Sequence, residues 1–178
     1  MRIGKQKQLF FTLYFLVAIA CGVLGCARSA KTEGDVVMAP DFTLPSLDGG
    51  TRSLADFRGR PLILVFWRIN CPSCEYQMPF LQAFYEKWSD DEVALVTVNV
   101  GEPPAMVGEY VARHGLTFPV LLDTRQQVAQ TYGIIGVPFT FLIDAEGIVR
   151  AYKVGPFQGS EAIEGAVKKV FPDVELKM

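Results

Sequence analysis

The sequence predicts an α/β sandwich built on a mixed β-sheet. The first observation is the continuous apolar run PLILVFW at residues 61–67, which is typical of a strand buried on both faces. The second is the stretch over residues 73–88, in which large apolar side chains recur every three or four positions, as in a helix. Strand and helix patterns then alternate until two strands form a hairpin near the C-terminus. The 178 residues, half of them hydrophobic, suffice for one domain with an apolar segment attached.

The first 26 residues are predicted to be a targeting segment outside the fold. Three basic residues and no acidic residue lie within the first seven positions, and residues 9–25 carry no charge. The run ends in VLGC, which resembles a bacterial lipobox in which Cys26 is diacylated and becomes the new N-terminus. A helix over residues 9–25 would be about 26 Å long, which is short for a hydrocarbon core of about 30 Å. Residues 1–26 are therefore either a lipoprotein-type signal peptide or an N-terminal membrane anchor in which Cys26 is an ordinary apolar residue.

A linker and then the folded domain follow this segment. Residues 27–39 (ARSAKTEGDVVMA) are mostly small or polar and lack a sustained periodicity, so they are predicted to be a linker. The domain is expected over residues 40–178. It begins with two short extended pieces within residues 41–57, which flank the hairpin-turn sequence DGG.

The remaining elements follow in chain order. Gly115 is placed to end a helix, and Ser160 is placed to cap the last helix, with Glu161 in its first turn. The expected strands span residues 61–67, 93–100, 120–122, 140–143 and 148–154, and the expected helices span residues 73–88, 105–114, 126–132 and 160–171.

The chemistry concentrates in the sequence CPSC, from Cys71 to Cys74, at the junction between the buried strand and the helix after it. The free N–H groups and the positive end of the dipole at a helix N-terminus stabilise a thiolate, so Cys71 is predicted to be the nucleophile. Cys74 lies one turn further along the same helix, within reach of a disulfide, and is predicted to be the resolving thiol. Pro72 suits the first turn, where its missing N–H has no helical partner.

Other uses of this cysteine pair are less favoured. A purely structural disulfide that encloses two residues gains little loop entropy, so redox exchange is the preferred interpretation. A metal site would need further ligands, whereas the chain holds one histidine, His114, and no second cysteine pair beyond the export segment. A net charge of −2 gives no reason to expect nucleic-acid binding.

Three features together resemble a known family. They are the strand-CxxC-helix unit, the sequence GVPFT at residues 136–140, and the segment that runs from VNVG at residues 98–101 to FPVLLD at residues 118–123. From about residue 40 to residue 172 the chain is similar to the thioredoxin-like, membrane-tethered thiol-disulfide oxidoreductases of the ResA and TlpA type. The resemblance implies a three-layer sandwich whose mixed central sheet carries an N-terminal hairpin and a strand-helix insert. It also implies that Pro138 is cis and faces CxxC, leaving the backbone of Val137 free to bind a substrate strand.

The resemblance further implies an extracytoplasmic thiol-disulfide oxidoreductase. We expect a reductase of protein disulfides, plausible substrates being apocytochromes c before haem attachment, re-reduced by a membrane electron donor of the thiol-disulfide type. No cofactor is expected. Two alternatives stay open: a metal or haem chaperone that uses CxxC as a binding site, and a thiol peroxidase. The peroxidase motif Pro-x-x-x-Thr/Ser-x-x-Cys would place Pro and Thr or Ser where this chain has Leu64 and Arg68.

The chain departs from the family pattern at three positions near CxxC. Asn70 stands where relatives commonly have Trp, Val65 where they often have Asp or Asn, and Gln77 where ResA-like relatives have Glu. Arg68 is a cation that could help to hold the thiolate, and a solvated position at the rim is the alternative.

Overall fold

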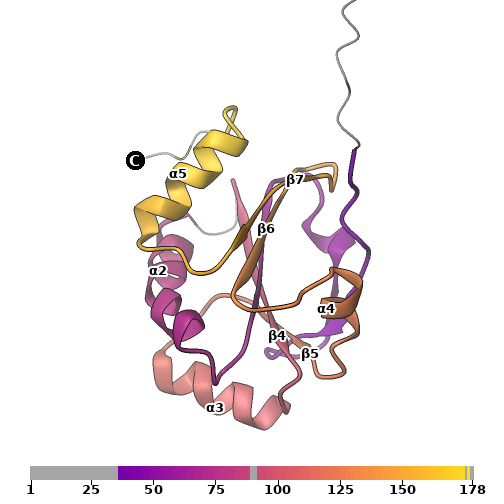
Figure 1. Ribbon diagram of the computed structural model, residues 1–178, viewed down its shortest axis with the longest axis vertical. Helices are drawn as coiled ribbons and strands as arrows, with labels where there is room; N and C mark the ends of the chain where they lie inside the picture. The colour runs from indigo at the N-terminus through magenta and orange to yellow at the C-terminus, as the bar shows by residue number, and fades with distance from the viewer. Residues whose placement is uncertain (1–35, 89–91, 175, 177–178) are drawn as a thin grey trace, which may run out of the picture. The chain divides into compact units, whose positions relative to one another are not determined.

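Strand β3 (Leu62–Trp67) lies at the centre of the fold, and its whole length is buried. The computed structural model describes residues 36–88, 92–174 and 176 (Figure 1). The other strands are β1 (Thr43–Pro45), β2 (Thr51–Ser53), β4 (Ala94–Val100), β5 (Val120–Asp123), β6 (Phe139–Ile143) and β7 (Val149–Val154). The helices are the 3-10 helix η1 (Leu54–Phe57) and the α-helices α2 (Pro72–Trp88), α3 (Pro104–His114), α4 (Gln127–Thr131) and α5 (Ser160–Val170).

Five strands form the predicted mixed sheet, and their order is β5-β4-β3-β6-β7. Strands β3, β4 and β5 are parallel neighbours, whereas β6 runs antiparallel to β3 and β7 runs antiparallel to β6. Strands β1 and β2 pair separately as the expected N-terminal hairpin. Because β3 and β4 are parallel, the chain leaves both strands at the same edge of the sheet, with Trp67 paired to Asn99. That edge is where the functional site is built.

The side chains of β3 alternate between two cores, which produces the expected three layers. Ile63, Val65 and Trp67 pack in one core with residues of α2, α3 and α5. Leu62, Leu64 and Phe66 pack in the other core with residues of the hairpin, η1 and α4. Figure 1 shows α2 and α5 on one side of the sheet and α4 with the indigo N-terminal elements on the other.

The predicted strands of the central sheet and the predicted helices match the structure to within one residue at each end, but one predicted helix cap is wrong. Gly115 ends α3 in the left-handed conformation, as expected. Ser160 does not cap α5: the cap residue is Gly159, and no side chain caps the helix there. Gly159 has a φ of 148°, which favours glycine, so the turn into the helix is made by the glycine and Ser160 becomes the first helical residue.

The last residues of the predicted linker lie beside the start of β7. Met38 pairs with Ile148, and the N–H of Val149 donates to the carbonyl of Val37. The predicted signal peptide or anchor, Cys26 included, and most of the linker lie outside the described residues. Within the described ranges, no helix combines the length and the apolar character that a membrane span requires.

Candidate active site

Cys71 and Cys74 are joined in a disulfide at the N-terminus of α2, with their Cα atoms 5.2 Å apart. Cys71 occupies the position that caps the helix. Its carbonyl oxygen accepts the N–H groups of Cys74 and Glu75, each at 2.9 Å. Its Sγ accepts the N–H of Cys74 at 3.1 Å, as the oxygen of a capping Ser or Asp side chain does. The N-terminus of α2 thus already donates an N–H to the Cys71 sulfur in the disulfide. After reduction, the same helix terminus can stabilise the Cys71 thiolate.

The two sulfurs differ in their access to solvent. Cys74 is 0% exposed and packs in the core on the α2 side of the sheet. Cys71 is only partly buried and packs at the border of that core. A partner molecule therefore reaches Cys71 first, and Cys74 reacts only with a group already attached to its neighbour.

A loop before β6 lies opposite the disulfide. The peptide bond between Val137 and Pro138 is cis, and Pro138 is buried. The carbonyl oxygen of Val137 lies 3.6 Å from the Sγ of Cys71. Residues 66 positions apart in the chain thus meet at the reacting sulfur because β6 is the antiparallel neighbour of β3.

Glu102 braces the chain just before Cys71, and the sequence analysis did not single it out. Both of its carboxylate oxygens accept the N–H of Ile69, at 3.1 and 2.9 Å, and Oε2 also accepts the side-chain N–H of Asn99 at 2.6 Å. Glu102 directly follows the turn after β4, whose end lies beside the end of β3. The sequence signal for this role was an acidic residue shortly after β4, the strand that runs parallel to β3.

The three departures from the family pattern fall in different environments. Val65 is fully buried in the middle of β3, so an apolar side chain takes the position where relatives often have a polar one. Asn70 is exposed at the rim. Arg68 is also exposed, and its guanidinium donates to the side-chain oxygen of Gln126 at 2.8 Å, whereas no hydrogen bond among the described residues joins it to Cys71.

Gln77, the third departure, is 0% exposed and lies one turn beyond Cys74 on α2. Its side-chain oxygen accepts the N–H of Phe157 at 3.2 Å. Its side-chain nitrogen has no hydrogen-bond partner among the described residues. An uncharged amide therefore ties α2 to the segment before α5 next to the buried sulfur.

The acidic groups near the start of α2 lie toward its surface. Glu75 is exposed, and its carboxylate lies 4.0 Å from the ring of His114 at the end of α3. Tyr110 stacks on His114 and contacts Trp67. Burial raises the pKa of Tyr110, and the charges of Glu75 and Glu102 raise it further. The Tyr110 side chain, which packs in the core, is therefore uncharged at physiological pH.

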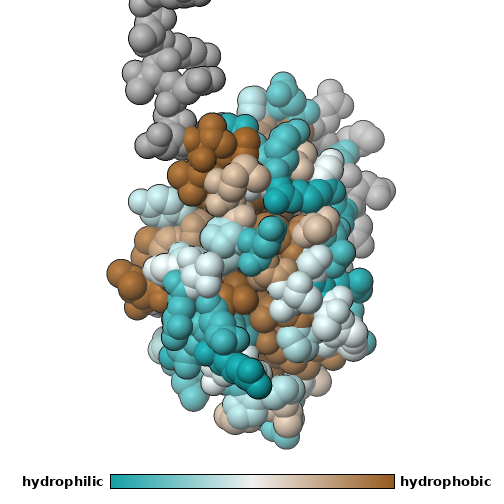
Figure 2. Space-filling model, turned by 90° about the vertical axis from the view of Figure 1, so that its right-hand side faces the viewer, coloured by the Kyte–Doolittle hydropathy of each residue, from teal (hydrophilic) through white to brown (hydrophobic). Residues whose placement is uncertain are grey.

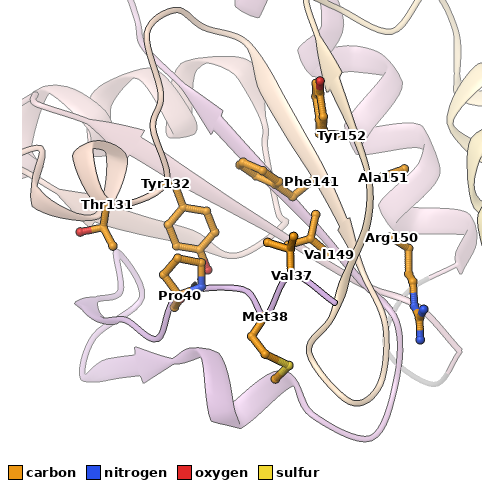
Figure 3. Close-up of a pocket in the computed structure, with 10 residues that line it drawn as sticks. All are labelled: Val37, Met38, Pro40, Thr131, Tyr132, Phe141, Val149, Arg150, Ala151 and Tyr152. Atoms are coloured by element: carbon orange, nitrogen blue, oxygen red, sulfur yellow. Dashed lines mark hydrogen bonds between the residues drawn. The ribbon is translucent and has the colours of Figure 1, made fainter. Parts of the chain in front are cut away.

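A pocket of about 640 Å³ lies away from the disulfide, on the face that carries α4 (Figures 2 and 3). Val37, Met38 and Tyr152 are exposed apolar side chains among its lining residues. Figure 2 shows brown apolar surface on this face, interrupted by teal polar groups. None of the pocket's lining residues belongs to CPSC or to the cis-proline loop, so the pocket is separate from the redox site.

The described geometry defines a class of protein. One reachable sulfur is bonded to an enclosed one, and a helix N-terminus is in place to hold the thiolate that reduction would release. These are the requirements of disulfide exchange, and the three layers with a cis-proline opposite CxxC are those of a thioredoxin-like fold. The protein is a thiol-disulfide oxidoreductase.

Comparison with known proteins identifies the family. The sequence matches the AhpC/TSA family over residues 37–152. It is 41% identical over 155 residues to the thiol-disulfide oxidoreductase ResA of Geobacillus thermodenitrificans, which covers 85% of this chain and 89% of that protein. The chain belongs to the ResA-type thiol-disulfide oxidoreductases within the AhpC/TSA family.

Two solved structures are similar. A thioredoxin-family thiol:disulfide interchange protein of Chlorobium tepidum superposes with a TM-score of 0.69 at 28% identity, over 78% of this chain and 98% of that chain. The exposed lipoprotein thioredoxin Etrx1 of Streptococcus pneumoniae superposes with a TM-score of 0.63 at 29% identity, over 73% of this chain and 99% of that chain. The predicted thioredoxin-like fold and the predicted oxidoreductase activity are confirmed.

The alternative functions receive no support from the site. The peroxidase motif would need a proline and a hydroxyl side chain at two positions that are occupied by Leu64, which is fully buried in β3, and by Arg68. In the described part of the chain, no group of three or more His, Cys, Asp or Glu side chains is placed to hold a metal ion.

Gln77 leads to a prediction about the reduced protein. Because Gln77 carries no charge, we expect the Cys71 thiolate to form in a single step as the pH rises. Gln77→Glu should move thiolate formation to higher pH by on the order of one unit, since a carboxylate charge close by disfavours a second negative charge. Absorbance of the thiolate against pH measures this. Gln82→Glu, five residues and roughly one and a half turns further along α2, is the control and should leave the curve in place. A two-step curve for the unchanged protein, or no shift with Gln77→Glu, would show that position 77 is not coupled to the thiols.

Proposed function

We propose that this protein is a membrane-tethered, extracytoplasmic reductase of protein disulfides, in which Cys71 attacks and Cys74 resolves. The observation that carries the proposal is the contrast between Cys71, which is partly exposed and whose sulfur accepts an N–H at the start of α2, and Cys74, which is fully buried. Only the first can meet a disulfide in another protein.

The reaction transfers two electrons by exchange of sulfur bonds. In the reduced protein, the Cys71 thiolate attacks one sulfur of the substrate disulfide, and the other substrate sulfur leaves as a thiolate that takes up a proton. The Cys74 thiol gives up its proton and attacks the Sγ of Cys71, so the mixed disulfide breaks and the second substrate thiolate leaves. The disulfide between Cys71 and Cys74 is the oxidised product of this cycle.

Val137 and Pro138 are assigned to substrate binding. The carbonyl of Val137 faces the Cys71 sulfur, and the proline ring after it has no N–H. A substrate segment in an extended conformation can pair with the backbone of Val137 and thereby hold its own disulfide at the attacking sulfur. The affinity would come from main-chain hydrogen bonds, so many sequences could bind.

The direction of electron flow and the partners are inferred from the family. The similarity to ResA favours reduction, with disulfides of apocytochromes c as the expected substrates before haem attachment. A membrane donor of the thiol-disulfide type would supply the two electrons that each cycle consumes. Cys71 would accept them because it is the sulfur that a protein donor can also reach.

The N-terminal segment supplies the proposed tether. Residues 1–26 have the composition of a lipoprotein signal peptide, with Cys26 as the residue to be lipidated, or of an uncleaved anchor. The sequence VLGC at residues 23–26, which resembles a lipobox, supports the first alternative. In either case the domain would work at the outer face of the cytoplasmic membrane.

The roles of the two cysteines are tested by trapping. Cys74→Ala removes the second step and leaves the first, so a mixed disulfide between Cys71 and its natural partner should accumulate. Cys71→Ala should trap nothing, because Cys74 stays buried. Non-reducing gels and mass spectrometry of the adducts provide the measurement. Adducts that form only when Cys71 is removed would reverse the assignment.

The tether is tested by the mass of the mature protein. If Cys26 is lipidated, mature chains begin at Cys26, and Cys26→Ser should block processing and leave a heavier precursor. Cys21→Ser, in the same apolar run, is the matched control and should be processed normally. A wild-type protein that keeps residues 1–25 and has the same length as Cys26→Ser would identify an uncleaved anchor.

A further inference from the structure

A small pocket of about 140 Å³ opens beside the redox disulfide, between the end of β3 and α4. Arg68 lines it from the β3 side, Gln126 and Gln130 line it from the start and body of α4, and Ile135 and Val137 line it from the cis-proline loop. Its volume suits one side chain rather than a folded element. Ile135 at its margin is fully exposed.

A single residue, Val137, separates the pocket from the reacting sulfur of Cys71. Val137 contributes to its wall and also holds its carbonyl oxygen 3.6 Å from the Sγ of Cys71. Neighbouring residues of an extended chain are about 3.3 Å apart. Side chains of an extended segment point alternately to its two faces, so a substrate cysteine that faces Cys71 on the α2 side of the sheet turns the residue next to it toward the α4 side, where this pocket lies.

Arg68 is the charged residue among those that line the pocket. Arg68 makes no ion pair with any described residue, and its hydrogen bond goes to the neutral side-chain oxygen of Gln126. The carboxylates of Glu102 and Asp123 lie near the same sheet edge, but they accept backbone N–H groups and do not line the pocket. Arg68 is thus the charged group that the pocket presents to a ligand.

Gln126 is the hydrogen-bond partner of Arg68 at the pocket. Gln126 has a φ of 59°, which non-glycine residues seldom adopt, and its backbone N–H donates to the carbonyl of Asp123. Its side chain packs against Gly101 so closely that a Cβ there would lie 2.7 Å from the amide nitrogen. The guanidinium that donates to this amide oxygen has further N–H groups left for a carboxylate.

We propose that this pocket binds an acidic side chain, Asp or Glu, next to the reacting cysteine of the substrate, and that Arg68 determines this preference. The inference rests on the proposed reductase function and specifies the class of disulfide that is reduced fastest. It requires no change in the exchange chemistry.

The test uses the full-length reduced protein in detergent and three disulfide-bonded peptides. The peptides differ only in the residues that flank the attacked cysteine, which are Asp, Asn or Lys, and each rate is divided by the rate of reduction by dithiothreitol to remove intrinsic reactivity. At low ionic strength the Asp peptide should be reduced about two- to fivefold faster than the Asn peptide, the range expected for an exposed ion pair. The preference should shrink as salt is added.

Variants of Arg68 provide the decisive comparison. Arg68→Gln should remove the preference for Asp, and Arg68→Glu should invert it so that the Lys peptide reacts faster than the Asp peptide. Arg52→Gln, on β2, is the matched control and should keep the wild-type preference. Equal normalised rates for all three peptides, or an Asp preference that survives in Arg68→Glu, would overturn the inference while leaving the reductase function in place. Failure to reduce any peptide would instead contradict the proposed function, and the inference would fall with it.

Discussion

The site depends on a single junction, at which a fully buried strand ends and a helix begins. Strand β3 is locked between two cores, so the position and direction in which the chain leaves it are fixed. Cys71 then caps α2 with both its carbonyl oxygen and its sulfur. Because the sulfur itself satisfies an N–H at the helix terminus, the reactive group is part of the local fold and not an addition to it.

The surroundings of that junction explain the difference between the two thiols. The turn of α2 that carries Cys71 outward turns Cys74 into the core, where it is fully enclosed. Glu102 fixes the backbone before Cys71, and the cis-proline loop closes the opposite side. Each contact comes from a neighbour of β3 in the sheet, so the parallel pairing with β4 and the antiparallel pairing with β6 assemble the site.

Patterns within short stretches of sequence predicted those parts of the fold that depend on residues close together in the chain. The apolar run of β3, the periodicity of α2 and the CPSC sequence are contiguous, so the sequence sufficed to place the thiols at a helix start. The hydrogen bonds from the N–H of Ile69 to Glu102 and from the N–H of Phe157 to Gln77 join positions 33 and 80 residues apart, and no short sequence pattern predicts them. The predicted cap of α5 was wrong for a different and local reason: the turn into the helix depends on the backbone angle of Gly159 and not on the hydroxyl of Ser160.

The central claim is that this junction produces a reductant, and the reduction potential of the CxxC pair tests it most directly. Among the described residues, the Cys71 sulfur accepts one backbone N–H and no hydrogen bond from a cationic side chain, so the thiolate is stabilised only moderately and the reduced form is not strongly favoured. Equilibration of the full-length protein with dithiothreitol mixtures of known composition measures the potential. We expect a value close to that of thioredoxin, about −270 mV. A value close to that of DsbA, about −120 mV, would mean that the protein oxidises its partners and would contradict the account.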